Sequence, residues 1–397
     1  MQKKVAITGM GIVSAIGMTV EENFHALMSK KTGISRLELF DSKHASSIKV
    51  GEIKKSNNEL IQLLGLDSNN TFTRTALLGA LAAKQAFDQA QLKPNDVLNV
   101  GLISSTSVGG MDFTEKHYKK YNEHPEYIPF ISSHHAGDST NKIADYLGIK
   151  GFVTTISTAC SSAANAIMLG AQMIENGYLD RVIVGGTDAL SKFTINGFKT
   201  LMILSDTDNT PFDQNRKGLN LGEAAAFLVL ESDECVQKQN KKVLGYVVGY
   251  GNANDAYHQT ASSENGEGAF LAMKKAFEKA EISSNQIDYI NVHGTATPNN
   301  DLSEGRALLR IFDSVPKFSS TKAFTGHTLA AAAAIEAVYS LLALQHQVVF
   351  PNLNFSTPME EFNLIPETEV HSHPIDYVLS NSFGFGGNCS TLIFSKS

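Results

Sequence analysis

The chain has 397 residues, of which 42% are hydrophobic and 18% are charged, and its formal net charge is −7. This composition is typical of a globular protein, with enough residues for two domains or one large α/β unit. The negative charge and the lack of a Lys/Arg run argue against nucleic-acid binding.

The N-terminus and the cysteines bear on the compartment in which the protein works. Residues 1–9 enter a predicted strand at once and lack the apolar stretch and cleavage site of a signal peptide. We expect no apolar run long enough to span a bilayer, and therefore no membrane contact. The cysteines Cys160, Cys235 and Cys389 are far apart and form no CxxC pair, which favours neither a disulfide framework nor a zinc site. We therefore expect a reduced, cytoplasmic protein.

Short apolar runs alternate with helical patterns along the chain, which favours α/β architecture with sheets covered on both faces. The polar stretch 232–242 is the best boundary between an N-terminal half, 1–238, and a C-terminal half, 239–397. Strands are predicted at 4–8, 97–104, 152–157, 181–185, 225–230, 243–250, 289–293, 317–320, 377–381 and 391–395. The clearest helices are predicted at 73–89, 161–176, 266–280 and 328–344.

The stretch TTISTACSSAANAI, residues 154–167, places Cys160 between a short buried strand and an alanine-rich buried helix. Unpaired backbone N–H groups and the helix dipole at such a position favour a thiolate. A free cysteine is more often a small buried hydrophobic residue. Position alone therefore leaves both a structural and a catalytic role open.

Three further stretches place polar groups or glycines at predicted strand ends. YINVHGTATPNND carries His293, FSSTKAFTGHTLAAAAAIEA carries Lys322 and His327, and VLSNSFGFGGNCSTLIF holds a Gly-rich turn. Functional groups of α/β proteins gather at the carboxyl ends of strands. A thiol, two imidazoles and an amine are the groups that a thiol nucleophile and its proton-handling or oxyanion-stabilising partners require. Taken singly, each residue is more typical of a core or surface position.

These motifs resemble those of the β-ketoacyl-acyl-carrier-protein synthases of the elongating type I/II, within the thiolase-like superfamily. The resemblance runs from VAITGMGIVSAIG to NSFGFGG and includes TACSS, HGTATPNND and STKAFTGH. It implies a five-layered α-β-α-β-α fold of two similar halves, the first carrying the nucleophilic cysteine, assembled as a dimer. Thiolases match less well, because they carry a second catalytic cysteine in a Gly-rich motif that Cys389 does not match.

The resemblance also implies a reaction. Cys160 would take an acyl chain from the phosphopantetheine arm of acyl carrier protein. Malonyl carrier protein would lose carbon dioxide, and its enolate would attack the acyl-cysteine to give a 3-oxoacyl product. His293 and His327 would donate to the malonyl thioester oxygen, with His327 kept neutral by a nearby helix N-terminus, and Lys322 would set local charge. The backbone N–H groups of Cys160 and Phe385 would hold a second oxyanion. No other cofactor is implied.

Further positions match the family by resemblance alone. Phe385 would also gate the acyl pocket, and Glu304 would pair with Lys322. Phe383 matches a supporting residue of the site. Thr295 and Thr297 match residues that bind the pantetheine arm, and Val108 and Phe198 match residues that line the acyl pocket. A monovalent cation site is matched by Asn291, Glu336 and Ser380.

The sequence departs from the family pattern in places that bear on the pathway. Ala330 and Ala334 stand where relatives have glycines, Asn388-Cys389 replaces Thr-Asn, and basic residues for carrier-protein docking are sparse. Two functions remain open: a synthase of fatty acid biosynthesis, or a specialised ketosynthase of a polyene or polyketide pathway. The first is expected as a homodimer, the second as a heterodimer with a chain-length-factor-like subunit. A partner protein without turnover is disfavoured because the four polar site residues are intact.

Overall fold

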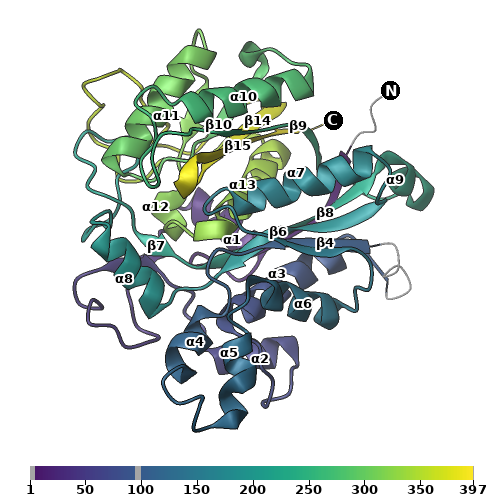
Figure 1. Ribbon diagram of the computed structural model, residues 1–397. Coiled ribbons are helices and arrows are strands. Elements are labelled where there is room, and N and C mark those ends of the chain that lie inside the picture. Colours follow the sequence, from purple (N-terminus) through teal and green to yellow (C-terminus); the bar gives the residue numbers. More distant parts are fainter. Residues whose placement is uncertain (1–4, 94–99, 397) are drawn as a thin grey trace.

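The computed structural model describes residues 5–93 and 100–396 and shows two halves with the same sheet topology (Figure 1). The N-terminal half has the strand order β1-β8-β6-β4-β5, and the C-terminal half has β9-β15-β14-β10-β11. When the five strands of each half are numbered one to five along the chain, both halves have the spatial order 1-5-4-2-3. In both halves the last three of these are parallel, and the fifth strand is antiparallel to its two neighbours. The strands are β1 (Val5–Ser14), β4 (Val100–Ser105), β5 (Val153–Ile156), β6 (Arg181–Asp188), β8 (Ala224–Ser232), β9 (Gly245–Asn254), β10 (Tyr289–Asn291), β11 (Lys317–Ser319), β14 (Tyr377–Phe383) and β15 (Asn388–Ser395).

Helices cover both faces of each half and complete five layers (Figure 1). The helices α7 (Ser162–Glu175) and α13 (Ala332–His346) lie between the halves and contact strands of both. The outer face of the N-terminal half is covered by α3 (Arg74–Gln89) and α6 (Ala136–Leu147). The outer face of the C-terminal half is covered by α10 (Glu267–Ala280) and α11 (Pro298–Ile311). The predicted α-β-α-β-α fold of two similar halves is therefore confirmed.

Smaller elements surround these layers. A three-stranded sheet consists of β2 (Ile34–Arg36), β3 (Lys49–Gly51) and β7 (Leu221–Gly222), and β12 (Val348–Val349) pairs with β13 (His371–Ser372). The other helices are α1 (Val20–Met28), α2 (Asn57–Leu64), α4 (Met111–His117), α5 (Ile128–Ser132), α8 (Lys192–Thr200), α9 (Asp233–Gln239) and α12 (Lys322–Thr325). The 3-10 turns are η2 (Pro125–Tyr127), η3 (Ser284–Gln286), η4 (Leu329–Ala331) and η5 (Phe385–Gly387).

Strand β1 is longer than predicted because its glycines serve helix packing and do not end the strand. A Cβ atom at Gly9 would lie 2.2 Å from the carbonyl oxygen of Ala86, and one at Gly11 would lie 2.1 Å from that of Ala82. Both carbonyls belong to α3, so only glycine lets the helix approach this closely. The first three residues of the strand predicted at 97–104 lie outside the described residues.

Strand β5 was predicted to be buried, but all four of its residues are only half-buried. It stands at the edge of the sheet, where one side has no neighbouring strand within the described chain. The prediction was wrong because an edge strand can be as rich in β-branched residues as a central one.

One helical segment in the described part of the chain, Leu329–His346, is long and apolar enough to span a membrane by length and composition. The expectation that no run reaches this length is therefore wrong. Of this segment 89% is buried inside the protein, because α13 lies between the two halves. Its apolar character all round is that of a central core helix.

The proposed division of the chain at residues 238 and 239 falls within α9, between the last strand of one half and the first strand of the other. It stays a prediction.

Candidate active site

Cys160 lies in a tight turn between β5 and α7, held by side chains of the same segment. Ala159 has φ of +54°, a conformation that non-glycine residues rarely adopt. The Ser162 hydroxyl accepts from the Thr158 N–H at 2.8 Å, and the Ser161 hydroxyl donates to the Thr158 carbonyl at 2.8 Å. The turn places Cys160 just before the helix, with a side chain that is only 6% exposed.

His293 follows β10 and is anchored through its backbone by a carboxylate of α11. Glu304 accepts from the N–H groups of His293 and Gly294, both at 2.8 Å, and from Asn381 Nδ2 at 3.1 Å. The imidazole itself is buried, and its Nδ1 has no hydrogen-bond partner among the described residues. The side chain is thus free to serve a bound molecule while its backbone is fixed.

Lys322 begins α12, and its ammonium forms an ion pair with Glu336 of α13. Both side chains are 1% exposed. The prediction that Glu304 pairs with Lys322 is wrong, because Glu304 is occupied by the backbone after β10. The sequence contains both acids on helices near the site, and only their packing decides which one meets the lysine.

His327 lies in the loop before η4, where the backbone selects one tautomer. The backbone N–H of His327 donates to the Asn220 carbonyl at 2.7 Å. The imidazole Nδ1 of His327 accepts from the Leu329 backbone N–H at 3.1 Å. A neutral imidazole that accepts at Nδ1 carries its proton on Nε2. His327 therefore presents an N–H donor on its other edge.

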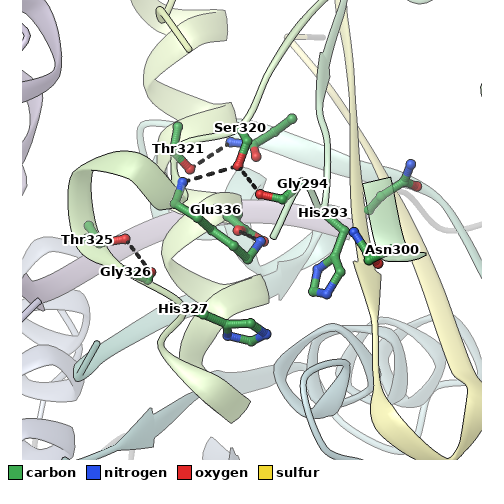
Figure 2. Close-up of polar contacts among 12 residues, drawn as sticks. His293, Gly294, Asn300, Ser320, Thr321, Thr325, Gly326, His327 and Glu336 are labelled. Carbon is green, nitrogen blue, oxygen red and sulfur yellow. Dashed lines mark hydrogen bonds and ion pairs between the residues drawn. The ribbon is translucent and has the colours of Figure 1, made fainter. Parts of the chain in front are cut away.

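The side chains of Cys160, His293 and His327 line one cavity. Figure 2 shows the two imidazoles near each other. The Cys160 sulfur and one ring nitrogen each of His293 and His327 all lie within 4.8 Å of one another. The two imidazoles are nearly perpendicular, with ring centres 5.4 Å apart. The three groups predicted from separate motifs thus meet at one point.

Burial governs the protonation of the site. Burial, with help from the Lys322 charge, lowers the pKa of His327 to about 3. The same causes, together with His327 itself, hold the pKa of His293 well below its usual value. Both imidazoles are therefore neutral at physiological pH.

The thiol is neutral as well. Burial raises the pKa of Cys160 to about 11, although the charge of Lys322 and the backbone N–H groups of Phe385 and Cys160 act to lower it. The expectation that the helix N-terminus holds a resting thiolate is therefore wrong, because desolvation outweighs the dipole at this depth.

The Gly-rich turn closes the site from the other side. A Cβ atom at Gly384 would lie 2.8 Å from the Thr158 carbonyl and 3.2 Å from the Cys160 nitrogen, so glycine is required there. Gly386 and Gly387 both have φ of +82°. Phe385 stacks on Phe198 with ring centres 6.0 Å apart. The turn therefore brings the Phe385 backbone against Cys160.

Asn388 connects this turn to the turn that carries Cys160, a contact that the sequence does not predict. Its Oδ1 accepts from Ser161 Oγ at 2.7 Å and from the side-chain amides of Asn165 and Asn252, both at 2.9 Å. In the sequence this position differs from the family pattern, which has threonine there. Three donors from β9 and the start of α7 converge on one oxygen that belongs to β15.

The cavity has a volume of about 310 Å³ and a mostly apolar lining. Of the predicted binding residues, Thr295, Thr297 and Phe198 line it, together with Phe383 and Phe385. Val108 does not line the cavity; it packs with Phe198 against a neighbouring hydrophobic cluster. The sequence did not single out Cys389 as a wall of the same cavity.

Two of the three residues matched to a cation site are neighbours. Asn291 and Ser380 are paired across β10 and β14. Asn291 Oδ1 and Glu336 Oε2 are buried without a hydrogen-bond partner in the described part of the chain. Hard cations prefer such oxygen ligands, so the residues fit the prediction, which remains one.

The β-ketoacyl synthase N-terminal domain model matches residues 2–235, and the β-ketoacyl synthase C-terminal domain model matches residues 244–356. A 3-oxoacyl-[acyl-carrier-protein] synthase 2 of Staphylococcus aureus (strain N315) is 34% identical over 99% of this chain and 98% of its own length. The ishigamide ketosynthase/chain length factor structure has a TM-score of 0.94 at 27% identity, covering 100% of both chains. The type II polyketide synthase complex AntDE:AntF, a ketosynthase with its acyl-carrier protein, has a TM-score of 0.89 at 27% identity and the same coverage. The chain therefore belongs to the β-ketoacyl synthase family of the thiolase-like superfamily and is an enzyme of the condensing type.

Proposed function

We propose that the protein is a 3-oxoacyl-[acyl-carrier-protein] synthase, an acyltransferase that extends an acyl chain by decarboxylative condensation with malonyl carrier protein. The observation that carries this proposal is the convergence of the Cys160 sulfur and one nitrogen each of His293 and His327 within 4.8 Å. A nucleophile and two neutral N–H donors that line an apolar cavity suit a reaction that builds a covalent acyl-enzyme and then stabilises an enolate.

In the first half-reaction the Cys160 sulfur attacks the thioester carbonyl of an acyl chain held on phosphopantetheine. A carbon–sulfur bond forms to Cys160, the bond to the pantetheine sulfur breaks, and the thiol proton ends on the departing pantetheine. The backbone N–H groups of Cys160 and Phe385 stabilise the tetrahedral oxyanion. Support comes from their action on the same sulfur in the free protein, where both lower the pKa of Cys160.

In the second half-reaction the malonyl group loses carbon dioxide, and the electron pair of the broken bond forms an enolate. His293 and His327 donate to the enolate oxygen. Its carbon then attacks the acyl-cysteine carbonyl, and the Cys160 sulfur leaves and regains a proton. The low pKa values of both imidazoles support this role, because a neutral imidazole keeps one N–H donor and is too weak an acid to protonate the enolate.

Lys322 acts as the fixed positive charge of the site, with Glu336 holding it in place. Thr295 and Thr297 contact the pantetheine arm, on the support that both line the cavity. Phe385 is the gate to the acyl pocket, on the support of its contact with Phe198 and of the two glycines with positive φ that follow it. We assign no cofactor beyond the carried phosphopantetheine.

We propose acyl carrier protein as the substrate-bearing partner, supported by the AntDE:AntF complex. The Staphylococcus aureus relative, a 3-oxoacyl-[acyl-carrier-protein] synthase 2, supports a role in fatty acid biosynthesis. For that role we propose a homodimeric enzyme. All three cysteines are free, which suits a reduced cytoplasmic setting.

A second candidate function is a specialised ketosynthase of a polyene or polyketide pathway, paired with a chain-length-factor-like subunit. The similarity to the ishigamide ketosynthase/chain length factor structure favours it. In both candidates the chemistry at Cys160 is the same, and the carrier protein and partner subunit differ.

One kinetic comparison separates the two candidates. Purified enzyme, alone and with any synthase-like subunit encoded beside it, is offered saturated and polyenoyl chains on the housekeeping carrier and on a locally encoded one. Equal or higher kcat/KM with saturated chains on the housekeeping carrier supports the fatty-acid role and excludes the specialised one. A requirement for the second subunit and a preference for polyenoyl chains give the opposite result. Absence of any acyl-enzyme on Cys160 overturns both.

A further inference from the structure

Asp188, at the carboxyl end of β6, is a buried carboxylate that the proposed chemistry does not use. Its side chain is 0% exposed, and it makes no ion pair with any residue of ranges 5–93 and 100–396. Burying a carboxylate without a cationic partner costs several kcal/mol unless hydrogen bonds compensate. The identity of its donors therefore indicates what the residue is for.

One set of donors comes from the loop after β4. The Thr106 hydroxyl donates to Oδ1, the Ser107 hydroxyl donates to Oδ2 at 2.5 Å, and the Val108 N–H donates to Oδ1 at 3.3 Å. Thr106 Oγ1 in turn accepts from the N–H of Gly109, whose φ is +54°. Asp188 thus fixes the conformation of the loop that carries Val108.

The other donor comes from the turn after His327. The Ala330 N–H donates to Asp188 Oδ2 at 2.9 Å. In the same turn, η4, the Leu329 N–H donates to His327 Nδ1 at 3.1 Å. Leu329 has φ of +54°, so this backbone is held in a conformation that it would not favour alone. Asp188 therefore holds the residue directly after Leu329, whose N–H group selects the His327 tautomer.

We propose that Asp188 is a positioning residue that holds η4 so that His327 keeps its proton on Nε2 and directs that donor into the cavity. Asp188 also connects η4 to the loop of residues 106–109. The loop beside the acyl pocket and the His327 donor of the malonyl step therefore move as one unit. The inference rests on the proposed function in one respect, the use of His327 in the malonyl half-reaction.

The test uses Asp188→Asn, which keeps the size of the side chain and removes half of its acceptor capacity. In one orientation the amide NH2 group replaces Oδ1 and faces the donors of Thr106 and Val108. In the other it replaces Oδ2 and faces the donors of Ser107 and Ala330. The η4 turn loses its anchor in one orientation and the pocket loop in the other. Loss of one oxyanion donor costs about 100- to 1,000-fold in rate, so we expect loss of its alignment to slow condensation at least about tenfold.

Three readouts separate positioning from general damage. Acylation of Cys160, followed by intact mass, should stay within about twofold, and release of carbon dioxide from malonyl carrier protein should fall with condensation. The side-chain ¹⁵N spectrum of a histidine-labelled sample should show one Nε2–H tautomer for His327 in the native protein and a mixture in Asp188→Asn. A His327→Asn sample assigns the signal.

Asp213→Asn is the matched control. Asp213 is also a buried carboxylate that accepts backbone N–H groups, those of Asn215, Ser356 and Thr357 at 2.7, 2.6 and 2.8 Å. Its carboxylate makes no hydrogen bond to η4, so we expect its replacement to lower stability without separating decarboxylation from acylation or changing the His327 signal.

An unchanged His327 tautomer with full decarboxylation in Asp188→Asn overturns the inference, as does an equal loss of acylation and decarboxylation with a native His327 spectrum. If native enzyme shows neither acylation nor decarboxylation, the proposed function fails. The tautomer spectrum then still decides whether Asp188 holds the histidine.

Discussion

Lys322 and Glu336 form a buried ion pair, and this pairing leaves Glu304 free to anchor the backbone of His293. The two carboxylates have separate tasks although both lie on helices beside the site. Burial raises the pKa of Glu336 to about 6 against the opposing charge of Lys322, and burial raises that of Glu304 to about 7. Because the two carboxylates have different partners, variants of Glu336 and of Glu304 should differ in their energetic coupling to Lys322.

Replacing Glu336 with Gln should destabilise the protein by about 3–5 kcal/mol, because the Lys322 ammonium would stay buried without its counter-ion. The free energy of unfolding in urea measures the loss. A double-mutant cycle with Lys322→Met should show strong coupling to Glu336→Gln, and the matched cycle with Glu304→Gln should show weak coupling. Stronger coupling to Glu304 would contradict the observed pairing.

The two histidines should act on the malonyl half-reaction alone. In His293→Ala and in His327→Ala we expect acyl transfer to Cys160 to persist, while condensation falls at least about 100-fold through loss of an N–H donor. Intact mass of the acyl-enzyme and carbon dioxide release report the two steps. If both variants fold but fail to acylate, the division of roles is wrong.

Cys160 should react with iodoacetamide faster as pH rises, because the thiolate is the reactive form and the thiol has a pKa of about 11. Well below that pKa, each pH unit raises the thiolate fraction about tenfold. The rate should therefore still be rising between pH 7 and 10. Peptide mapping in a Cys235→Ser background avoids competition from the half-buried third thiol.

Cys389 is the internal comparison in that experiment. Burial, together with the charges of Asp255 and Glu304, raises its pKa further than that of Cys160, so it should label more slowly at every pH. Labelling of Cys389 before Cys160, with condensation intact, would remove Cys160 from its proposed role.

Gly384→Ala should impair acylation more than stability, because the added methyl would meet the Thr158 carbonyl at 2.8 Å and push the Gly-rich turn away from Cys160. We expect slower formation of the acyl-enzyme in stopped reactions followed by mass. Gly197→Ala is the control: it lies in α8 with open space around its Cβ position, and should be neutral or stabilising by up to about 1 kcal/mol. An unchanged rate of acyl-enzyme formation in Gly384→Ala would contradict this prediction and show that the turn accommodates the methyl group.

Local sequence determined much of this protein. The strand-end motifs predicted that Cys160, His293, Lys322 and His327 would meet, because the carboxyl ends of the strands lie along one edge and a short loop keeps its residues near the strand end. The five-layered fold followed from the family resemblance. Asp188 is not among the predicted site residues because the strand predicted at 181–185 stops short of it, whereas β6 continues to Asp188.

Only the tertiary structure decided the rest. The partner of Lys322 depends on which of two helices packs beside α12, and the order of residues along the chain does not contain that choice. The protonation of Cys160 depends on how much water the surrounding side chains exclude; its local position at a helix N-terminus predicts a thiolate, and its burial produces a thiol. Likewise the exposure of β5 depends on its place at the edge of the sheet. Local composition indicates that a segment forms a strand, but it does not indicate how many neighbouring strands will flank it.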